Sequence, residues 1–283
     1  MNNWVLLTII YAILVSLSEV TKKKATKSNS IIEVLAGHIL VALIVTFFTT
    51  KDIFDINYNF LPIIFIKSLI IYITWILGLK ALDGLDLGIY GMVKISRVIF
   101  SVLLSCILLG EKITSVTAIG MAMIITGLIL VNTTAIDDSN KKNSWKLVLL
   151  FLVSCFGSSV SAIIDKKILV YVSTGQLQFW FLLFLTLFYW ITLFVKKEKI
   201  NFKNLKTNYW VLIVGILLAI GDRFLFIANQ NPDSKVIVMT MLKQLSVVIS
   251  IILGKLIFDE KNILKKILYS ILIITGVVLI SIF

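Results

Sequence analysis

The chain contains one segment twice, and each copy includes an apolar stretch long enough to cross a membrane. Residues 94–130 align without gaps on residues 243–279, at a constant offset of 149, and 11 of the 37 positions are identical. Repeated membrane segments are typical of secondary transporters, in which the two copies build one site where they meet. The chain is therefore expected to fold as two related halves around a shared interior.

Composition places nearly the whole chain in the lipid bilayer. Hydrophobic residues make up 59% of the 283 positions, compared with about 45–50% in ordinary soluble domains. A helix needs about 20 apolar residues to cross the hydrocarbon, and ten segments qualify. The predicted spans are residues 4–20, 31–50, 60–80, 87–109, 114–132, 146–170, 176–195, 208–228, 235–257 and 264–282. Since little chain is left over, any site must lie between the helices.

The number of spans fixes how the halves are related. Each half has five spans, and an odd number turns the second copy upside down. The predicted fold is therefore an all-α integral membrane protein with ten transmembrane helices as two inverted five-helix repeats. The first repeat covers residues 1–132 (spans 1–5), the second covers 146–283 (spans 6–10), and residues 133–145 form a polar linker. The early parts of the halves align at a smaller offset of 143, which matches Ser18 with Ser161.

The basic residues predict an orientation. The connections that follow the odd-numbered spans, with their flanks, hold 17 of the 27 Lys and Arg residues, whereas the other connections and the termini hold five. Cytoplasmic loops carry the excess of Lys and Arg, so both termini are expected outside the cytoplasm. This distribution also explains the basic net charge without nucleic acid.

The repeated motif resembles a known family. Leu108-Leu109-Gly110-Glu111-Lys112, followed by Gly120 and Ile125-Thr126-Gly127, is similar to the EamA-like branch of the drug/metabolite transporter superfamily. Phe258-Asp259-Glu260-Lys261 with Ile274-Thr275-Gly276 is a weaker second copy, in which Phe258-Asp259 replaces the usual Leu-Gly. The proline common in spans 4 and 9 is absent. The resemblance implies a multi-pass permease of the cytoplasmic (inner) membrane. Members of known structure mostly have cytoplasmic termini, which conflicts with the distribution of basic residues; we keep that distribution as the primary indication.

Three spans carry polar residues along one helical face. Spacings of three and four residues place side chains on the same side of a helix, and such stripes on apolar helices predict one shared aqueous cavity. The stripes are Tyr90, Lys94, Arg97 and Ser101 in span 4; Thr240, Lys243, Ser246 and Ser250 in span 9; and Ser154, Ser158, Ser161 and Asp165 in span 6.

The charges inside the spans favour an anionic ligand. Five cations, Lys67, Lys94, Arg97, Arg223 and Lys243, outnumber the single central carboxylate that we count, Asp222. An excess of fixed positive charge attracts anions, and the guanidinium fork of Arg97 suits carboxylate or phosphate. The predicted substrate-binding residues are Tyr90, Lys94, Arg97, Asp222, Arg223 and Lys243. A structural alternative is that Asp222 pairs with Lys243 or Arg97, and that Lys67 extends to the membrane interface.

Other ionisable residues have weaker signals. Glu33 and His38 in span 2 are candidates for coupling to a proton, because imidazole titrates near neutrality; helix packing is the alternative role of His38. Glu111 and Glu260 each end a span just before the next helix, so each is predicted to cap the amino terminus of that following helix.

The expected function is secondary transport of a small polar, anionic metabolite by alternating access. The alternatives are an exporter of amino acids or cationic compounds, with Asp222 or Glu33 as the charge partner, and a flippase for a phosphorylated carrier lipid. No catalytic motif is found, so an enzyme is not expected. Cys106 and Cys155 lack metal-ligand spacing, and no cofactor or metal is expected. The expected partners are the small-molecule substrate and the lipid bilayer, with homo-oligomerisation left open.

Overall fold

A computed structural model describes residues 3–25, 30–85, 87–133, 145–195, 208–258 and 263–282. The described residues form helices and no strands. The helices are α1 (Asn3–Ala25), α2 (Ile31–Thr49), the short 3-10 helix η1 (Tyr58–Phe60), α3 (Leu61–Gly84), α4 (Leu87–Leu109), α5 (Ser115–Thr133), α6 (Trp145–Ile168), α7 (Thr174–Val195), α9 (Tyr209–Gln230), α10 (Val236–Leu242), α11 (Leu245–Phe258) and α12 (Ile263–Ile282).

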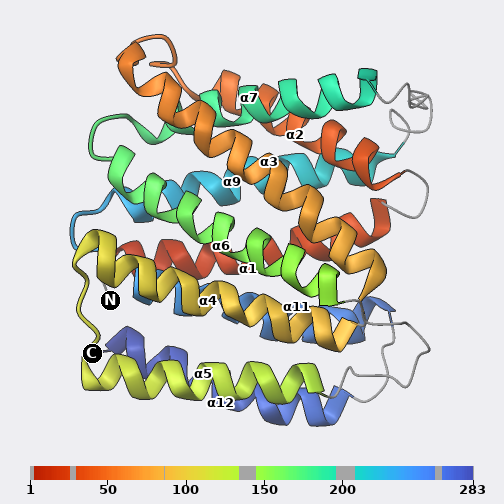
Figure 1. The fold of residues 1–283 in the computed structure, drawn as a ribbon, viewed down its shortest axis with the longest axis vertical. Helices are drawn as coiled ribbons and strands as arrows, with labels where there is room; N and C mark the ends of the chain where they lie inside the picture. The colour runs from red at the N-terminus through yellow and green to blue at the C-terminus, as the bar shows by residue number, and fades with distance from the viewer. Residues whose placement is uncertain are drawn as a thin grey trace.

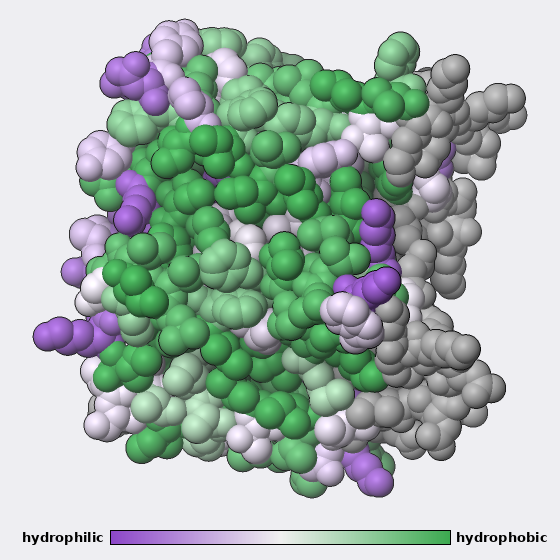
Figure 2. Space-filling view, in the orientation of Figure 1, coloured by the Kyte–Doolittle hydropathy of each residue, from purple (hydrophilic) through white to green (hydrophobic). Residues whose placement is uncertain are grey.

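Ten of the described helical segments are long and apolar enough to cross a membrane, with α10 and α11 together forming the ninth. This confirms the predicted ten-helix fold. Figure 2 shows a broad apolar band across the middle of one face, with hydrophilic side chains gathered towards its two edges. A helix satisfies its backbone hydrogen bonds internally, so it can present such an apolar surface to lipid.

The helices form two layers related by the repeat. One layer runs α7, α3, α6, α4 and α5, and the other runs α2, α9, α1, α11 and α12, each helix packing on its neighbours in the series. The counterparts in the two repeats are α1 and α6, α2 and α7, α3 and α9, α4 and α10–α11, and α5 and α12. If every helix is replaced by its counterpart, one layer becomes the other. The layers meet firmly at their edges, through α2 with α7 and α5 with α12. The space between them is therefore the shared interior predicted from the repeat.

The two repeats run in opposite directions through the molecule. Helices α1, α3, α5, α7 and α11 end on one side, which we call the Ala25 end, and α1 begins and α12 ends at the opposite side, the Asn3 end (Figure 1). Helix α6, the counterpart of α1, begins at the Ala25 end. The inverted orientation of the repeats is thus confirmed. Most of the predicted linker, residues 134–144, lies outside the described residues.

Glycines of the repeated motif allow α5 and α12 to pack closely. A Cβ added at Gly276 would lie 2.7 Å from the carbonyl oxygen of Gly120, and one at Gly120 would lie 2.9 Å from the carbonyl oxygen of Gly276. Small residues let membrane helices approach to backbone contact. Gly120 and Gly276 therefore bring the two layers together at this edge.

We predict that Gly276→Ala lowers stability, because the added methyl group meets rigid backbone, and overpacking of this kind costs about 1–3 kcal/mol. The matched control is Gly78→Ala, whose Cβ would meet only the Ser154 and Phe151 side chains, at 3.5 and 3.8 Å. Thermal unfolding of the purified proteins measures both. A Gly276→Ala variant as stable as Gly78→Ala would contradict the close packing.

Candidate functional site

A polar central cavity lies between the two layers. It consists of three adjoining spaces of about 290, 220 and 100 Å³, all of which are lined by Glu19 on α1 and Arg97 on α4. The first space is lined by the carboxyl-terminal part of α1, the beginning of α2, and parts of α3, α4 and α6 that lie towards the Ala25 end. The central cavity is therefore displaced towards the Ala25 end.

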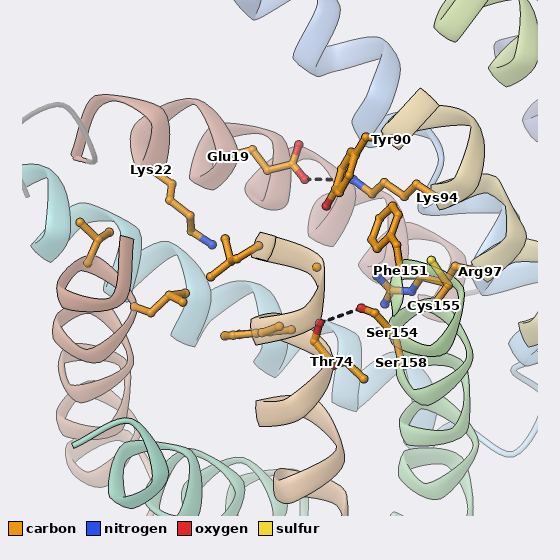
Figure 3. A pocket seen from close by; sticks show the side chains of 15 residues that line it. Glu19, Lys22, Thr74, Tyr90, Lys94, Arg97, Phe151, Ser154, Cys155 and Ser158 are labelled. Carbon is orange, nitrogen blue, oxygen red and sulfur yellow. Dashed lines mark hydrogen bonds and ion pairs between the residues drawn. The ribbon is translucent and has the colours of Figure 1, made fainter. Parts of the chain in front are cut away.

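All three polar stripes face this interior. The span-4 stripe, with Tyr90 and Lys94, and the span-6 stripe, with Ser158 and Asp165, line the central cavity, and of the span-9 stripe only Ser250 lies beyond it, in a neighbouring space. Two stripe residues also hold helices together: Ser154 donates to the Thr74 carbonyl oxygen at 2.7 Å, and the Ser101 hydroxyl donates to Ser159 on α6 at 3.0 Å. Figure 3 shows the side chains converging from α1, α3, α4 and α6.

The cations of α4 remain accessible although the helix lies in the middle of the molecule. Lys94 Nζ lies 3.8 Å from a Glu19 carboxylate oxygen, and the two side chains are 49% and 48% exposed. Figure 3 shows Arg97 and Lys94 on the same side of the space, with the rings of Tyr90 and Phe151 beside Lys94. The Tyr90 and Phe151 rings are stacked with centroids 4.1 Å apart. A solute entering the cavity would thus meet two cations and an aromatic wall.

Lys243 lies where a membrane helix is interrupted. Span 9 was predicted as one helix over 235–257, but it breaks at Lys243 and Gln244 into α10 and α11. The amides of Gln244 and Ser246 bond to carbonyls three residues back, at 2.9 and 3.1 Å, which tightens the chain. The Gln244 side chain donates to the Thr240 carbonyl oxygen at 3.0 Å. Because interrupted membrane helices expose polar backbone only where it lines a cavity, the break supports the prediction that Lys243 belongs to the candidate site.

Four further charges of the central cavity balance one another. Lys22 and Lys67 come from α1 and α3, and Asp165 and Asp222 come from α6 and α9, their counterparts in the second repeat. The charge count from sequence, five cations against one carboxylate, is therefore wrong for this cavity, because Glu19 and Asp165 add two carboxylates. Setting these four aside leaves Lys94, Arg97 and Lys243 opposed only by Glu19. The positive excess persists but is smaller.

The pair of Lys67 and Asp165 is enclosed. Lys67 Nζ lies 2.9 Å from an Asp165 carboxylate oxygen, with side-chain exposures of 2% and 11%. The ammonium also lies 3.5 Å from the centroid of the Phe181 ring, a cation–π geometry. Lys67 therefore does not extend to the membrane interface, because its counter-ion is inside the bundle.

We predict that Lys67→Met destabilises the protein by about 3–5 kcal/mol, since it leaves the Asp165 carboxylate buried without its counter-ion. The double variant Lys67→Met/Asp165→Leu is expected to recover most of this loss, because no charge remains to be buried. Lys94→Gln, which breaks an exposed pair, is the control and is expected to cost less than about 1 kcal/mol. Thermal unfolding decides; wild-type stability of Lys67→Met would show that the pair is not structural.

Arg223 does not join the cavity, contrary to the prediction. Its Nε donates to Gln178 Oε1 and its terminal nitrogen donates to Thr50 Oγ1, both at 2.6 Å, so it links α9 to α2 and α7. Asp222, the preceding residue, does line the central cavity. Consecutive residues point about 100° apart around a helix, so Asp222 and Arg223 face different neighbours.

Glu33 and His38 also lie away from the central cavity. Glu33 forms a capping box with Ser30, in which the Ser30 amide donates to Glu33 Oε2 at 2.9 Å. His38 Nδ1 lies 2.5 Å from the Val34 carbonyl oxygen, and its Nε2 is buried without a hydrogen bond among the described residues. Backbone of His38 packs where α2 meets Gly215 of α9. This placement fits the alternative role of His38, helix packing.

Two sets of hydrogen bonds link helices at the Asn3 end, one between the repeats and one within the second repeat. The Glu111 carboxylate accepts hydrogen bonds from the Val236 and Ile237 amides, at 2.6 and 2.9 Å. Glu111 was predicted to cap the helix that follows it, α5, and this prediction is wrong, because Glu111 caps α10. The amino terminus of α5 is capped by Thr114, whose hydroxyl accepts a hydrogen bond from the Thr117 amide. Lys166 donates to the carbonyl oxygens of Asn229 and Asn231 near the end of α9. Glu260 lies outside the described residues.

Glu19 and Lys22 are the site residues that sequence reasoning missed. Span 1 was predicted to end at residue 20, but α1 continues to Ala25 and carries Lys22 along the wall of the central cavity. A signal for Lys22 was present in the repeat. At the offset of 143, the stripe residues Ser161 and Asp165 correspond to Ser18 and Lys22, so projecting the stripe onto the first half finds this face.

Comparisons with known proteins agree with this architecture. The sequence model described as the EamA-like transporter family matches residues 2–133 and 145–282, which confirms the family resemblance of the repeated motif. No match was found among curated proteins. A solved structure titled "Crystal structure of protein" covers 99% of this chain and 95% of its own chain, with a TM-score of 0.75 and 14% identity. At that identity the likeness concerns the fold alone.

Proposed function

Since this chain belongs to the EamA-like transporter family, it is a membrane transporter of small molecules, and we propose that its substrate is a small polar anion. The observation that carries the proposal is the group of Lys94, Arg97 and Lys243 around one cavity, opposed only by Glu19 once the other four charges are balanced. Inside a protein the attraction between an anion and fixed cations is stronger than in water. The cluster therefore suits a carboxylate or a phosphate.

The geometry supports distinct roles for the three cations. Arg97 offers a planar fork for two oxygens of the anion, and the two lysines act as point charges from facing layers. Within the part of the chain that the structure describes, Lys94 has one ion pair, the exposed one with Glu19 at 3.8 Å. Exposed pairs contribute about 0–1 kcal/mol, so an incoming anion can replace Glu19 at Lys94 at little cost.

We predict that Lys94→Gln, Arg97→Gln and Lys243→Gln each weaken anion binding about tenfold to a hundredfold, because each removes a charge-assisted contact of about 1.5–3 kcal/mol. Binding of inorganic phosphate and of short carboxylates to purified protein measures the effect. Lys112→Gln, at the Asn3 end and outside the central cavity, is the matched control. Unchanged binding in both lysine variants would remove the anion site from this cavity.

The amino acid or cationic compound alternative has one supporting observation. The Glu19 carboxylate is 48% exposed beside the same cavity, and it accepts from the Ser250 hydroxyl at 3.2 Å. An ammonium group could bind there. In the binding measurements above, a preference for cationic over anionic ligands, with Glu19→Gln as the damaging variant, would favour this second function.

Alternating access is the proposed mechanism of movement. The central cavity lies towards the Ala25 end, while Glu111 and Arg223 link the repeats near the Asn3 end. In inverted repeats, the two halves can exchange conformations to open the other side. The break at Lys243 supplies a hinge, since the tightened chain there separates α10, which packs on α4, from α11. Release of the Asn3-end contacts would then accompany closure of the Ala25 end.

We predict from the distribution of basic residues that the Asn3 end faces outward, so the central cavity faces the cytoplasm in this conformation. In a background without Cys106 and Cys155, a cysteine at Lys112 should react with an impermeant maleimide in intact cells. A cysteine at Trp145, at the Ala25 end, should react only after the membrane is opened. The opposite labelling pattern would reverse the orientation.

A further inference from the structure

A further space, outside the three that form the central cavity, extends from it between α4 and α11. It has a volume of about 380 Å³ and shares Glu19, Tyr90, Lys94, Gln244 and Val247 with the central cavity. We call it the α4–α11 crevice. Beyond the five shared residues, it is lined by Gly91, Ile95, Leu128, Val131, Asn132, Ser250, Ile251 and Lys266.

The interruption of span 9 creates this crevice. Helix α10 packs against α4, but among the described residues α11, beyond the break at Lys243, makes no comparable contact with α4. The two helices therefore separate towards the Ala25 end. Helices α5 and α12, held together by their glycines, close the far side. The crevice is thus a branch of the central cavity and not a gap between loosely packed helices.

The crevice has an apolar wall beside Lys94, together with the polar side chains of Asn132, Gln244, Ser250 and Lys266. The side chains of Ile95, Leu128, Val131, Val247 and Ile251 come from three helices, α4, α5 and α11, and face the same space. Apolar surface of this kind gains free energy when an apolar group replaces water. Pockets of about 300–1,000 Å³ with mostly apolar walls and a few polar groups are typical of small-molecule sites. The cations of the central cavity and the apolar wall of the crevice together fit an amphiphilic ligand.

We infer that the transported anion is amphiphilic, with its charged group on Lys94, Arg97 and Lys243 and its apolar substituent in the α4–α11 crevice. This inference rests on the proposed function and names the substrate class of that same site. Tyr90 lies at the junction of the two spaces. There its ring, stacked on Phe151, would contact the part of the ligand that joins charge to apolar substituent. Both a membrane-derived lipid phosphate and a water-soluble organic anion have this chemistry.

A series of alkyl phosphates, from methyl to octyl, tests the inference on full-length protein in lipid nanodiscs. Affinity is expected to rise about fourfold for each methylene that enters the crevice, which corresponds to about 0.8 kcal/mol. Val247→Trp fills the crevice, and the dependence of affinity on chain length should disappear. Ile251→Gln adds no bulk and should reduce the same dependence, which guards against a folding defect in the tryptophan variant.

The control places a tryptophan on the other face of α4. Leu103 is 52% exposed on the surface of that helix, so Leu103→Trp should leave the chain-length dependence unchanged. Two results would overturn the inference, because each would place the alkyl chain elsewhere. One is a dependence of affinity on chain length that is equal in wild type, Val247→Trp and Ile251→Gln. The other is a dependence that only Leu103→Trp alters. Lys94→Gln separates the two proposals, because loss of methyl phosphate binding in that variant supports the anion site whatever the chain-length result. Methyl phosphate binding that is unchanged in both Lys94→Gln and Lys243→Gln would overturn the anion site itself.

A comparison of ligand sources completes the test. Dioleoyl phosphatidic acid in the nanodisc should compete with octyl phosphate if the site admits a lipid from the bilayer. Absence of competition, with the chain-length dependence intact, identifies a water-soluble amphiphile as the ligand. Both outcomes support an amphiphilic anion.

Discussion

A polar side chain in the hydrocarbon must find its partner or water inside the protein, and this constraint organises the whole molecule. The chain places polar stripes on α4, α6 and the broken helix α10–α11, and folding turns them towards one interior. Two layers of helices are the result, with apolar surfaces outward and a water-accessible space between them. The exposure of Lys94 and Glu19, close to half in each case, records how open that space is.

Charges in this interior fall into two groups with different consequences. Lys67 and Asp165 are enclosed and 2.9 Å apart, so they hold α3 to α6. Lys94 and Glu19 are exposed and 3.8 Å apart, so they are available to a ligand. The difference follows from solvent: water screens the exposed pair, whereas the enclosed pair has lost its hydration and depends on its partner. The proposed ligand site therefore shares one cavity with a structural ion pair.

The two repeats share a helix order but not every local feature. Helix α4 is continuous, whereas its counterpart is interrupted at Lys243. This single difference places a cation at the centre of the cavity, lets α10 pack on α4 and lets α11 diverge from it. The Glu111 carboxylate fixes the beginning of α10 from the opposite repeat. Closure of one end and the crevice at the other thus both depend on the interrupted helix.

The sequence by itself determined the ten spans, the inverted repeats and the three polar stripes. Each of these rests on local information, namely the length of an apolar run, the parity of the span count and the 3.6-residue period of a helix. Lys94, Arg97 and Lys243 were predicted from the stripes, and the structure brings them around the central cavity. Whether they bind an anion stays a prediction.

Tertiary structure decided which charges meet. Lys22 entered the cavity because α1 continues five residues beyond its predicted end, and Arg223 left it because its side of α9 faces α2 and α7. Glu111 caps a helix that begins 125 residues later. Such pairings depend on the rotation and length of helices packed against distant parts of the chain. Hydrophobic periodicity carries no information about them, because it specifies which face is buried but not which helix covers it.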